Sequence, residues 1–506
     1  MNHDRLSKWE YNIYLLLSMG IHFYSFYQVY LSSKEHEDEL EQEVGLETSF
    51  WGLKKDVSDF EWNFWMEWAH SRLLWLMLGH LAISQFSRIF FRKHHLWFLM
   101  CYGIASCWCV LGTKGLATIF LNTFIFYMIA QIKIPLLIWL SSALMLLMLH
   151  NETVENIQRG WYDTENEYYL LQFTLTVRCL FYTSFCLEYS GQQGDNHTFP
   201  SMLAYVFYYP VFHNGPIIPF NEFSEQMQKQ VTENKNIPYV ALFADVLRFI
   251  LWWCLAELMI HLMYMHAVYS HYPVLEEASY WTLGGLALAQ VLFFYVKYLV
   301  LYGLPALLVQ LDGLNSPPLP RCVSSLYSFS GIWRCFDVGL HRFLVRYIYI
   351  PMGGSQSGIQ RMLLSTALTF IFVCYWHGGH EYLWYWTALN WIGIVTEYGM
   401  KKLLTMPPIQ KTIDCCLSPR TFRLLHAALA SVSTALLILT NLVFLGGEQV
   451  GKIYWDRLFV HGWPWVPLVV LSCLFCFAQV GIEWNLFFFP KYKYKFPLCA
   501  RWKSER

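Results

Sequence analysis

Long apolar stretches separated by short polar connections make up most of the chain. They cover residues 9–30, 73–91, 96–111, 117–132, 134–149, 173–189, 240–268, 281–304, 362–375, 382–400, 424–445 and 463–480. A helix needs about 20 apolar residues to cross a bilayer, and several of these stretches are shorter. We therefore predict an all-α polytopic membrane protein with about ten transmembrane helices plus re-entrant and amphipathic segments.

One apolar stretch, residues 205–220, is interrupted by Pro210, Gly215, Pro216 and Pro219. A broken backbone cannot face lipid, because its unpaired N–H and C=O groups have no water to bind there. We expect this stretch to be re-entrant, either buried in protein or lining a water-filled cavity.

A different pattern follows at residues 333–347, where apolar residues recur at helical spacing. The apolar positions are Trp333, Phe336, Leu340, Phe343, Leu344 and Tyr347, and the polar ones are Arg334, Asp337, His341, Arg342 and Arg346. This alternation predicts one amphipathic helix, which Pro351 and the Gly353-Gly354 pair would end. We take residues 330–381 as the core of a single unit that spans residues 1–506.

The composition agrees with a membrane protein. Hydrophobic residues make up 56% of the chain and charged residues only 14%, whereas soluble proteins have about 25% charged residues. The net charge of −1 gives no reason to expect nucleic-acid binding. Aromatic residues, at 19%, suit interfacial belts or a cavity for a long apolar ligand.

The charges around the first two apolar stretches predict the orientation of the chain. Arg5 and Lys8 precede the first stretch, an acidic loop at 35–39 follows it, and basic residues close the second. By the positive-inside rule the N-terminus is then cytosolic. The glycosylation sequons at Asn151 and Asn196 are compatible with lumenal loops.

Two ionisable residues lie in or beside apolar sequence, where such groups are usually functional. His377 precedes Gly378-Gly379 and is suited to general-base chemistry, although a buried histidine held by one hydrogen bond fits equally well. His380, three residues on, is not excluded for the same role. Asp337 either orients or polarises the histidine or pairs with Arg334 or His341 on its own helix.

Several further residues carry both a functional and a structural interpretation. Arg334, Arg342 and Arg346 suit the phosphates of a cofactor such as coenzyme A, or else contact lipid headgroups. Asn441, alone in an apolar span, either donates to a carbonyl oxygen or ties two helices together. A thiolate at Cys322 can ligate a haem iron, but a single cysteine carries little weight.

The core motifs resemble one known family. The run W..FDVGLH.....YIYIP.GGS, followed by YWHGG.EYLWYW, is similar to the core of the membrane-bound O-acyltransferase superfamily. Further matches extend along nearly the whole chain to its branch that acylates Hedgehog signalling proteins. The resemblance implies a multi-pass enzyme with a central tunnel. It also implies transfer of palmitate from palmitoyl-CoA to the N-terminal cysteine amine of a Hedgehog protein.

The resemblance also implies roles for individual residues. It makes His377 the catalytic histidine, which acts as the general base, and Asp337 the second essential polar residue. It places Trp376 in the tunnel, Trp333 near the acceptor peptide and Asn441 near the acyl carbonyl.

A cofactor and a location follow from the same resemblance. It raises Cys322 as the ligand of a haem b iron, and it places the enzyme among the lipids of the endoplasmic reticulum membrane or of the Golgi. Two alternatives remain open from the residues alone. One is an acyl-CoA-dependent acyltransferase with a lipid acceptor; the other is a membrane transporter, because intramembrane histidine and aspartate also mark proton relays.

Overall fold

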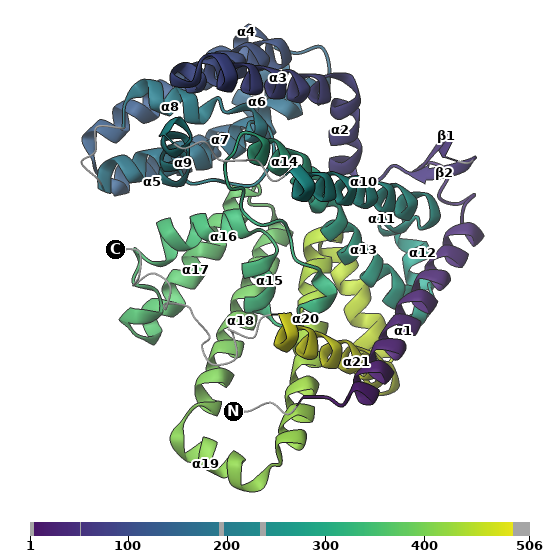
Figure 1. Ribbon diagram of the computed structural model, residues 1–506. Coiled ribbons are helices and arrows are strands. Elements are labelled where there is room, and N and C mark those ends of the chain that lie inside the picture. The colour runs from purple at the N-terminus through teal and green to yellow at the C-terminus, as the bar shows by residue number, and fades with distance from the viewer. Residues whose placement is uncertain (1–4, 51, 192–196, 233–238, 489–506) are drawn as a thin grey trace.

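The computed structural model describes residues 5–50, 52–191, 197–232 and 239–488, and these are largely helical (Figure 1). The α-helices are α1 (Lys8–Glu35), α2 (Phe60–Trp68), α3 (Leu74–Phe90), α4 (His95–Ile132), α5 (Pro135–Leu149), α6 (Glu152–Arg159), α7 (Glu165–Gly191), α8 (Phe199–Val206), α9 (Phe220–Thr232), α10 (Tyr239–Leu262), α11 (Met265–Ser270), α12 (Tyr272–Glu277), α13 (Tyr280–Leu301), α14 (Gly303–Leu311), α15 (Phe329–Cys335), α16 (Val338–Leu344), α17 (Ile359–Trp376), α18 (Glu381–Leu404), α19 (Pro407–Cys416), α20 (Pro419–Trp455) and α21 (Trp465–Phe488). Short 3₁₀ or π turns lie at η1 (Ala69–Leu73), η2 (Arg92–His94), η3 (Tyr209–Val211), η4 (Val323–Ser325), η5 (Val345–Tyr349), η6 (Gly354–Ser357) and η7 (Asp456–His461).

A small hairpin interrupts the helical pattern after α1. Strands β1 (Val44–Phe50) and β2 (Leu53–Asp56) pair antiparallel, with Val44 opposite Asp56. These strands were not predicted from the sequence. They are short and follow the acidic loop, where no apolar span is required.

Seven helical segments among the described residues are long and apolar enough to cross a membrane, or eight if the bent pair α5 and α6 forms one span. This is fewer than the predicted ten or so. The predicted spans 96–111 and 117–132 are two halves of α4, broken at Gly112, whose φ of 68° and ψ of −175° are not helical. The predicted spans 9–30, 240–268 and 382–400 lie on α1, α10 and α18, which are long helices outside the seven. The all-α, multi-pass architecture itself is confirmed.

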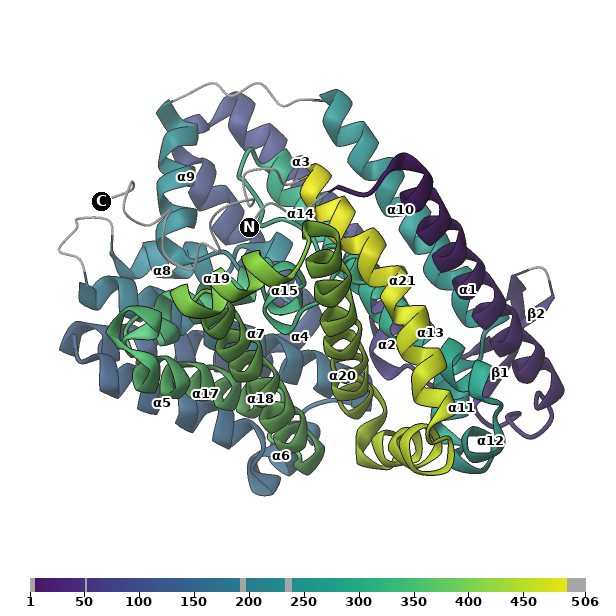
Figure 2. The same ribbon diagram turned by 90° about the horizontal axis from the view of Figure 1, so that it is seen from below.

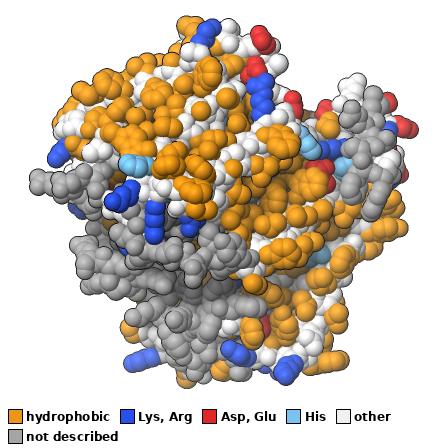
Figure 3. Space-filling model, turned by 45° about the horizontal axis from the view of Figure 1, so that its top comes forward, with side chains coloured by type: hydrophobic (Ala, Val, Ile, Leu, Met, Phe, Trp, Pro, Cys, Tyr) orange, Lys and Arg blue, Asp and Glu red, His pale blue; other side chains and the backbone are white. Residues whose placement is uncertain are grey.

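The helices form two groups with a third set between them (Figures 1 and 2). One apolar core joins α2, α4, α5, α7–α9 and α14, with part of α3 packed against it, and a second joins α1, α10–α13 and α20. A smaller core, formed by parts of α7, η5, α17 and α18, lies where residues 330–381 pack. Side chains on the outside are also largely apolar over the face shown in Figure 3, as expected for a surface in contact with lipid.

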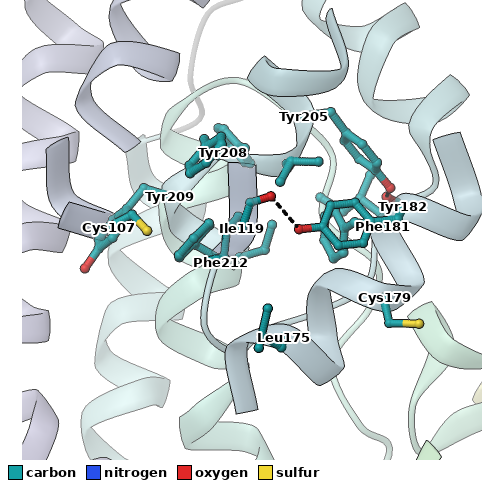
Figure 4. Close-up of a cluster of buried hydrophobic side chains, with 14 of the residues drawn as sticks. Cys107, Ile119, Leu175, Cys179, Phe181, Tyr182, Tyr205, Tyr208, Tyr209 and Phe212 are labelled. Atoms are coloured by element: carbon teal, nitrogen blue, oxygen red, sulfur yellow. Dashed lines mark hydrogen bonds between the residues drawn. The ribbon is translucent and has the colours of Figure 1, made fainter. Parts of the chain in front are cut away.

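The proline-interrupted stretch 205–220 is buried inside the first group, as predicted. All of its residues except Asn214 are buried. Arg178 of α7 donates to the carbonyl oxygens of Val206, at 2.6 Å, and Val211, and Tyr205 donates to that of Ile218. Aromatic rings of this stretch also pack against one another, as Tyr209 and Phe212 do (Figure 4). A protein interior that supplies these donors lets a broken backbone exist at membrane depth.

Candidate functional site

The predicted amphipathic helix is in fact two helices that meet at Asp337. α15 ends at Cys335 and α16 begins at Val338, and Asp337 between them has φ −112° and ψ 91°. The Leu340 N–H donates to its Oδ1 at 2.8 Å, which is the contact of a helix N-cap. The prediction of one continuous helix was wrong, because an aspartate side chain binds free N–H groups better at a cap than inside a helix.

Both carboxylate oxygens of Asp337 have hydrogen-bond donors. The hydroxyl of Tyr302, the residue between α13 and α14, donates to Oδ2 at 3.2 Å, whereas the Leu340 N–H binds Oδ1. Burial raises the pKa of the Asp337 carboxyl, and the hydrogen bonds act against this rise. In the described chain it forms no ion pair with Arg334 or His341, the two partners that the sequence offered.

His377 ends α17 and leads into two glycines that hold backbone conformations with φ of 109° and 67°. These left-handed conformations favour glycine, and they leave space beside the imidazole. The ring of His377 lies 4.7 Å from Trp376 and 5.5 Å from Phe444, yet the residue is accessible. Within the described residues its side chain has no hydrogen-bond partner, so it is not a buried histidine held by one hydrogen bond.

Aromatic contacts connect His377 with the Asp337 segment. Phe444 of α20 contacts both His377 and Phe294 of α13, at ring distances of 5.5 and 5.9 Å. Phe294 in turn stacks on Phe336, next to Asp337, at 5.1 Å. The two predicted catalytic residues thus lie along one aromatic wall, which is built from α13, α20 and the junction of α15 with α16.

The two tryptophans suggested for substrate contact are held in place by hydrogen bonds between helices. Trp333 donates to Asn390 Oδ1 at 3.1 Å and packs edge-on against Trp386, 5.3 Å away. Trp376 donates to the Thr176 carbonyl at 3.0 Å. Both indoles therefore have fixed orientations near the aromatic wall.

The three predicted phosphate-binding arginines differ in their surroundings. Arg346 forms a bidentate ion pair with Glu188 of α7, at 2.6 and 3.0 Å. Arg342 lies 3.8 Å from Glu222 and is half-exposed. Arg334 forms no ion pair in the part of the chain that the structure describes, which leaves its guanidinium available for a ligand.

Asn441 lines a small, largely apolar cavity. The cavity has a volume of about 60 Å³ and is bounded by α1, α13, α20, α21 and the segment 323–332. The Asn441 Nδ2 donates to the Leu437 carbonyl of its own helix at 2.7 Å. The side-chain oxygen takes no part in this hydrogen bond. The residue lies one helical turn from Phe444, and hence near the wall that carries His377.

The surroundings of Cys322 give no support for a haem. Cys322 is exposed, and it does not line the cavity that its neighbours Val323 and Ser324 border. No group of three or more His, Cys, Asp or Glu residues within the described chain is arranged to hold a metal. We therefore derive no chemistry through haem.

Three other polar residues, two of them in the proline-interrupted stretch, lie apart from the wall. His213 is buried and shares a 2.7 Å hydrogen bond with Thr174, while Asn214 binds the Gly215 N–H. His380 is exposed and stacks on Tyr382. Sequence reasoning missed Tyr302 and Phe444, because each is an ordinary aromatic within an apolar span and no local pattern distinguishes it.

Comparison with known proteins gives consistent matches. The model of MBOAT, the membrane-bound O-acyltransferase family, matches residues 124–440, a range that includes Asp337 and His377 and ends just before Asn441. The mouse protein-cysteine N-palmitoyltransferase HHAT is 57% identical over 491 residues, covering 95% of this chain and 98% of its own. The Drosophila melanogaster protein-cysteine N-palmitoyltransferase Rasp is 27% identical and covers 84% of this chain and 83% of its own. A mouse HHAT-like protein is 26% identical and covers 94% of each.

Proposed function

The chain belongs to the membrane-bound O-acyltransferase family, and from this premise we infer that it is a protein-cysteine N-palmitoyltransferase. Two relatives that align over most of the chain carry that name. We propose palmitoyl-CoA as the donor and the N-terminal cysteine of a Hedgehog signalling protein as the acceptor. We place the enzyme in the membrane of the endoplasmic reticulum, with its N-terminus in the cytosol.

His377 is the proposed general base, and its accessible imidazole is the observation that carries the proposal. No hydrogen bond to a described residue occupies either ring nitrogen, and aromatic rings lie beside it. An imidazole without a nearby charge is neutral near pH 7 and can accept a proton. An N-terminal amine has a pKa near 8 and must lose a proton before it attacks a thioester.

Asp337 and Asn441 are the proposed supporting groups. Asp337 is held by Tyr302 and Leu340 in one orientation, which suits it to bind the acceptor's amine or to polarise a neighbouring donor. We propose that Asn441 donates its remaining amide hydrogen to the acyl carbonyl as negative charge develops on that oxygen. A donor of this kind lowers the barrier by about 3–4 kcal/mol.

We propose that Arg334 binds the phosphates of the acyl donor, palmitoyl-CoA. This guanidinium forms no ion pair within the described chain, and an arginine fork matches the geometry of a phosphate. Arg342 is the second candidate, whereas Arg346 is already bound to Glu188. Trp333 and Trp376 would then bound the space in which the acyl chain and the acceptor peptide meet.

The reaction forms a carbon–nitrogen bond and breaks the thioester carbon–sulfur bond. The acceptor's ammonium loses one proton to His377, and its nitrogen attacks the carbonyl carbon. It loses a second proton as the amide forms. Coenzyme A leaves as the thiolate and takes up one of the two protons, while the other passes to water. An initial attack by the acceptor's thiol, followed by an S-to-N shift, gives the same amide.

The test compares wild type and His377→Ala purified in detergent, each incubated with palmitoyl-CoA and a peptide that begins with a Hedgehog-like cysteine. Mass spectrometry after hydroxylamine treatment distinguishes an amide from a thioester. We expect wild type to form the hydroxylamine-resistant amide and the variant to be slower by a factor of about 100 or more. A variant as active as wild type would remove the role of His377. Folded wild type that forms no amide would redirect the search to lipid acceptors.

A further inference from the structure

One face of α13 carries an unusual series of polar side chains. Lys297 is only 4% exposed, and its Nζ lies 2.9 Å from Asp59 Oδ2 and 3.0 Å from Glu61 Oε2. A buried lysine within a membrane span is energetically expensive and persists only with such partners. This ion cluster therefore fixes α13 against the start of α2.

Two tyrosines continue the same face toward the catalytic segment. Tyr298 and Tyr302 are one helical turn apart, and their rings meet edge-on at 5.0 Å. The Tyr298 hydroxyl donates to Glu61 Oε1 at 3.1 Å, whereas the Tyr302 hydroxyl donates to Asp337 Oδ2 at 3.2 Å. The two phenols thus have similar surroundings but different carboxylate partners.

Tyr302 is the side-chain donor to Asp337 within the described residues. The second oxygen is bound by the backbone of α16, through the Leu340 N–H. Among the described residues, the titratable groups on the side of Asp337 that faces α13 are Tyr298 in the last turn of that helix, Tyr302 directly after it and Glu61 of α2. The backbone contact exists in any capped helix, so the Tyr302 hydroxyl is what ties the carboxylate to the opposite helix.

We propose that Tyr302 is a positioning residue that fixes the Asp337 carboxylate in its ionised, reactive orientation. The ion cluster of Lys297, Asp59 and Glu61 holds the last turn of α13, which Tyr302 directly follows. This inference rests on the proposed role of Asp337 in palmitoyl transfer.

The hydrogen bond has a measurable consequence for pH dependence. Burial raises the pKa of Asp337, and the bond from Tyr302 acts against the rise, because it favours the charged carboxylate. Removal of the hydroxyl raises this pKa further. If activity needs the ionised carboxylate, the variant then loses activity at a higher pH than wild type when the solution is acidified. The acid limb of the kcat/KM profile therefore shifts to higher pH.

The test uses two substitutions at position 302 with opposite expected effects. Tyr302→Phe removes the donor, and it is expected to lower kcat about tenfold or more and to shift the acid limb to higher pH, with the KM for palmitoyl-CoA unchanged. Incorporation of 2,3-difluorotyrosine at position 302 strengthens the donor while preserving the ring, and it is expected to shift the acid limb to lower pH. Should the phenylalanine variant fail to fold, the fluorinated protein still decides the question.

Tyr298 supplies the matched control. The same two substitutions at position 298 alter only the hydrogen bond to Glu61, so the acid limb is expected to stay at its wild-type position. Wild-type amide formation in the same assay tests the proposed function separately from this inference. An active wild type whose acid limb is moved by neither substitution at position 302, or is moved equally by those at position 298, would overturn the positioning role.

Discussion

Asp337 combines a structural and a chemical role in one side chain. Its Oδ1 caps α16, and its Oδ2 accepts the hydrogen bond from Tyr302. Loss of activity on replacement of this residue would therefore not by itself distinguish a catalytic role from a lost helix cap. Substitutions that differ in capping ability can separate the two.

The first prediction compares Asp337→Asn with Asp337→Ala. Asparagine caps a helix about as well as aspartate, so the asparagine variant should lose less than about 1 kcal/mol of unfolding free energy. Its kcat should nevertheless fall about 100-fold or more, because it lacks the negative charge. The alanine variant should lose about 1 kcal/mol more in stability. Thermal unfolding in detergent and the amide assay measure both effects, and an asparagine variant with wild-type kcat would reduce Asp337 to a cap.

The arginines permit a second prediction at the same scale. Arg334→Ala should raise the KM for palmitoyl-CoA about tenfold and leave thermal stability unchanged, because a hydrogen bond to a charged group contributes about 1.5–3 kcal/mol. Arg346→Ala should instead destabilise the protein by about 3 kcal/mol, since Glu188, only 5% exposed, loses its ion-pair partner. If Arg346→Ala instead raised the KM and Arg334→Ala lowered the stability, Arg346 would be the residue that binds the donor.

At the scale of elements, the local sequence pattern predicted one backbone break and missed another. The prolines of residues 205–220 correctly predicted a broken, buried segment, because proline removes backbone donors wherever it lies. The helical spacing of residues 333–347 concealed the break at Asp337, because each half keeps the same apolar period. Where a capping side chain ends one helix and begins the next, the hydrophobic pattern does not show the break.

The packing of α1 on α13 gives a prediction at this scale. A Cβ at Gly285 would lie 2.4 Å from the Ser25 carbonyl oxygen of α1, whereas a Cβ at the adjacent Gly284 would meet nothing within 4 Å. Gly285→Ala should therefore destabilise the protein by about 1–3 kcal/mol. Gly284→Ala should be neutral or stabilise it by up to about 1 kcal/mol through helix propensity. Thermal unfolding of the two variants checks the pair, and equal stabilities would argue against the close approach of α1.

At the scale of the whole molecule, contacts place several helix ends on one side. Glu10 near the start of α1 pairs with Arg420 at the start of α20, and the Leu6 N–H donates to Glu483 of α21 at 3.3 Å. α19 directly precedes α20 (Figure 1). The start of α1 and α19 therefore lie at the same end of the molecule, which the basic residues Arg5 and Lys8 predict to be cytosolic.

This arrangement predicts which cysteines are accessible from the cytosol. Cys415 and Cys416 of α19 are exposed, so a membrane-impermeant maleimide added to sealed microsomes should label them. A Cys415→Ser, Cys416→Ser double variant should lose that share of the label and keep its activity. Labelling that requires permeabilised membranes would reverse the proposed orientation.

The sequence by itself determined the membrane class, the helical architecture and the family, because apolar runs, proline breaks and motifs such as those around Asp337 and His377 are local properties of the chain. It could also name those two residues, since ionisable groups in apolar sequence stand out. Only the tertiary structure decided the span boundaries, the break at Asp337 and the separate positions of Arg334 and Arg346. It alone brought Phe444 and Tyr302 to the site, more than 60 residues from His377 in sequence. Their contacts depend on how helices pack against one another, and a hydrophobic pattern specifies which face is apolar without specifying which helix covers it.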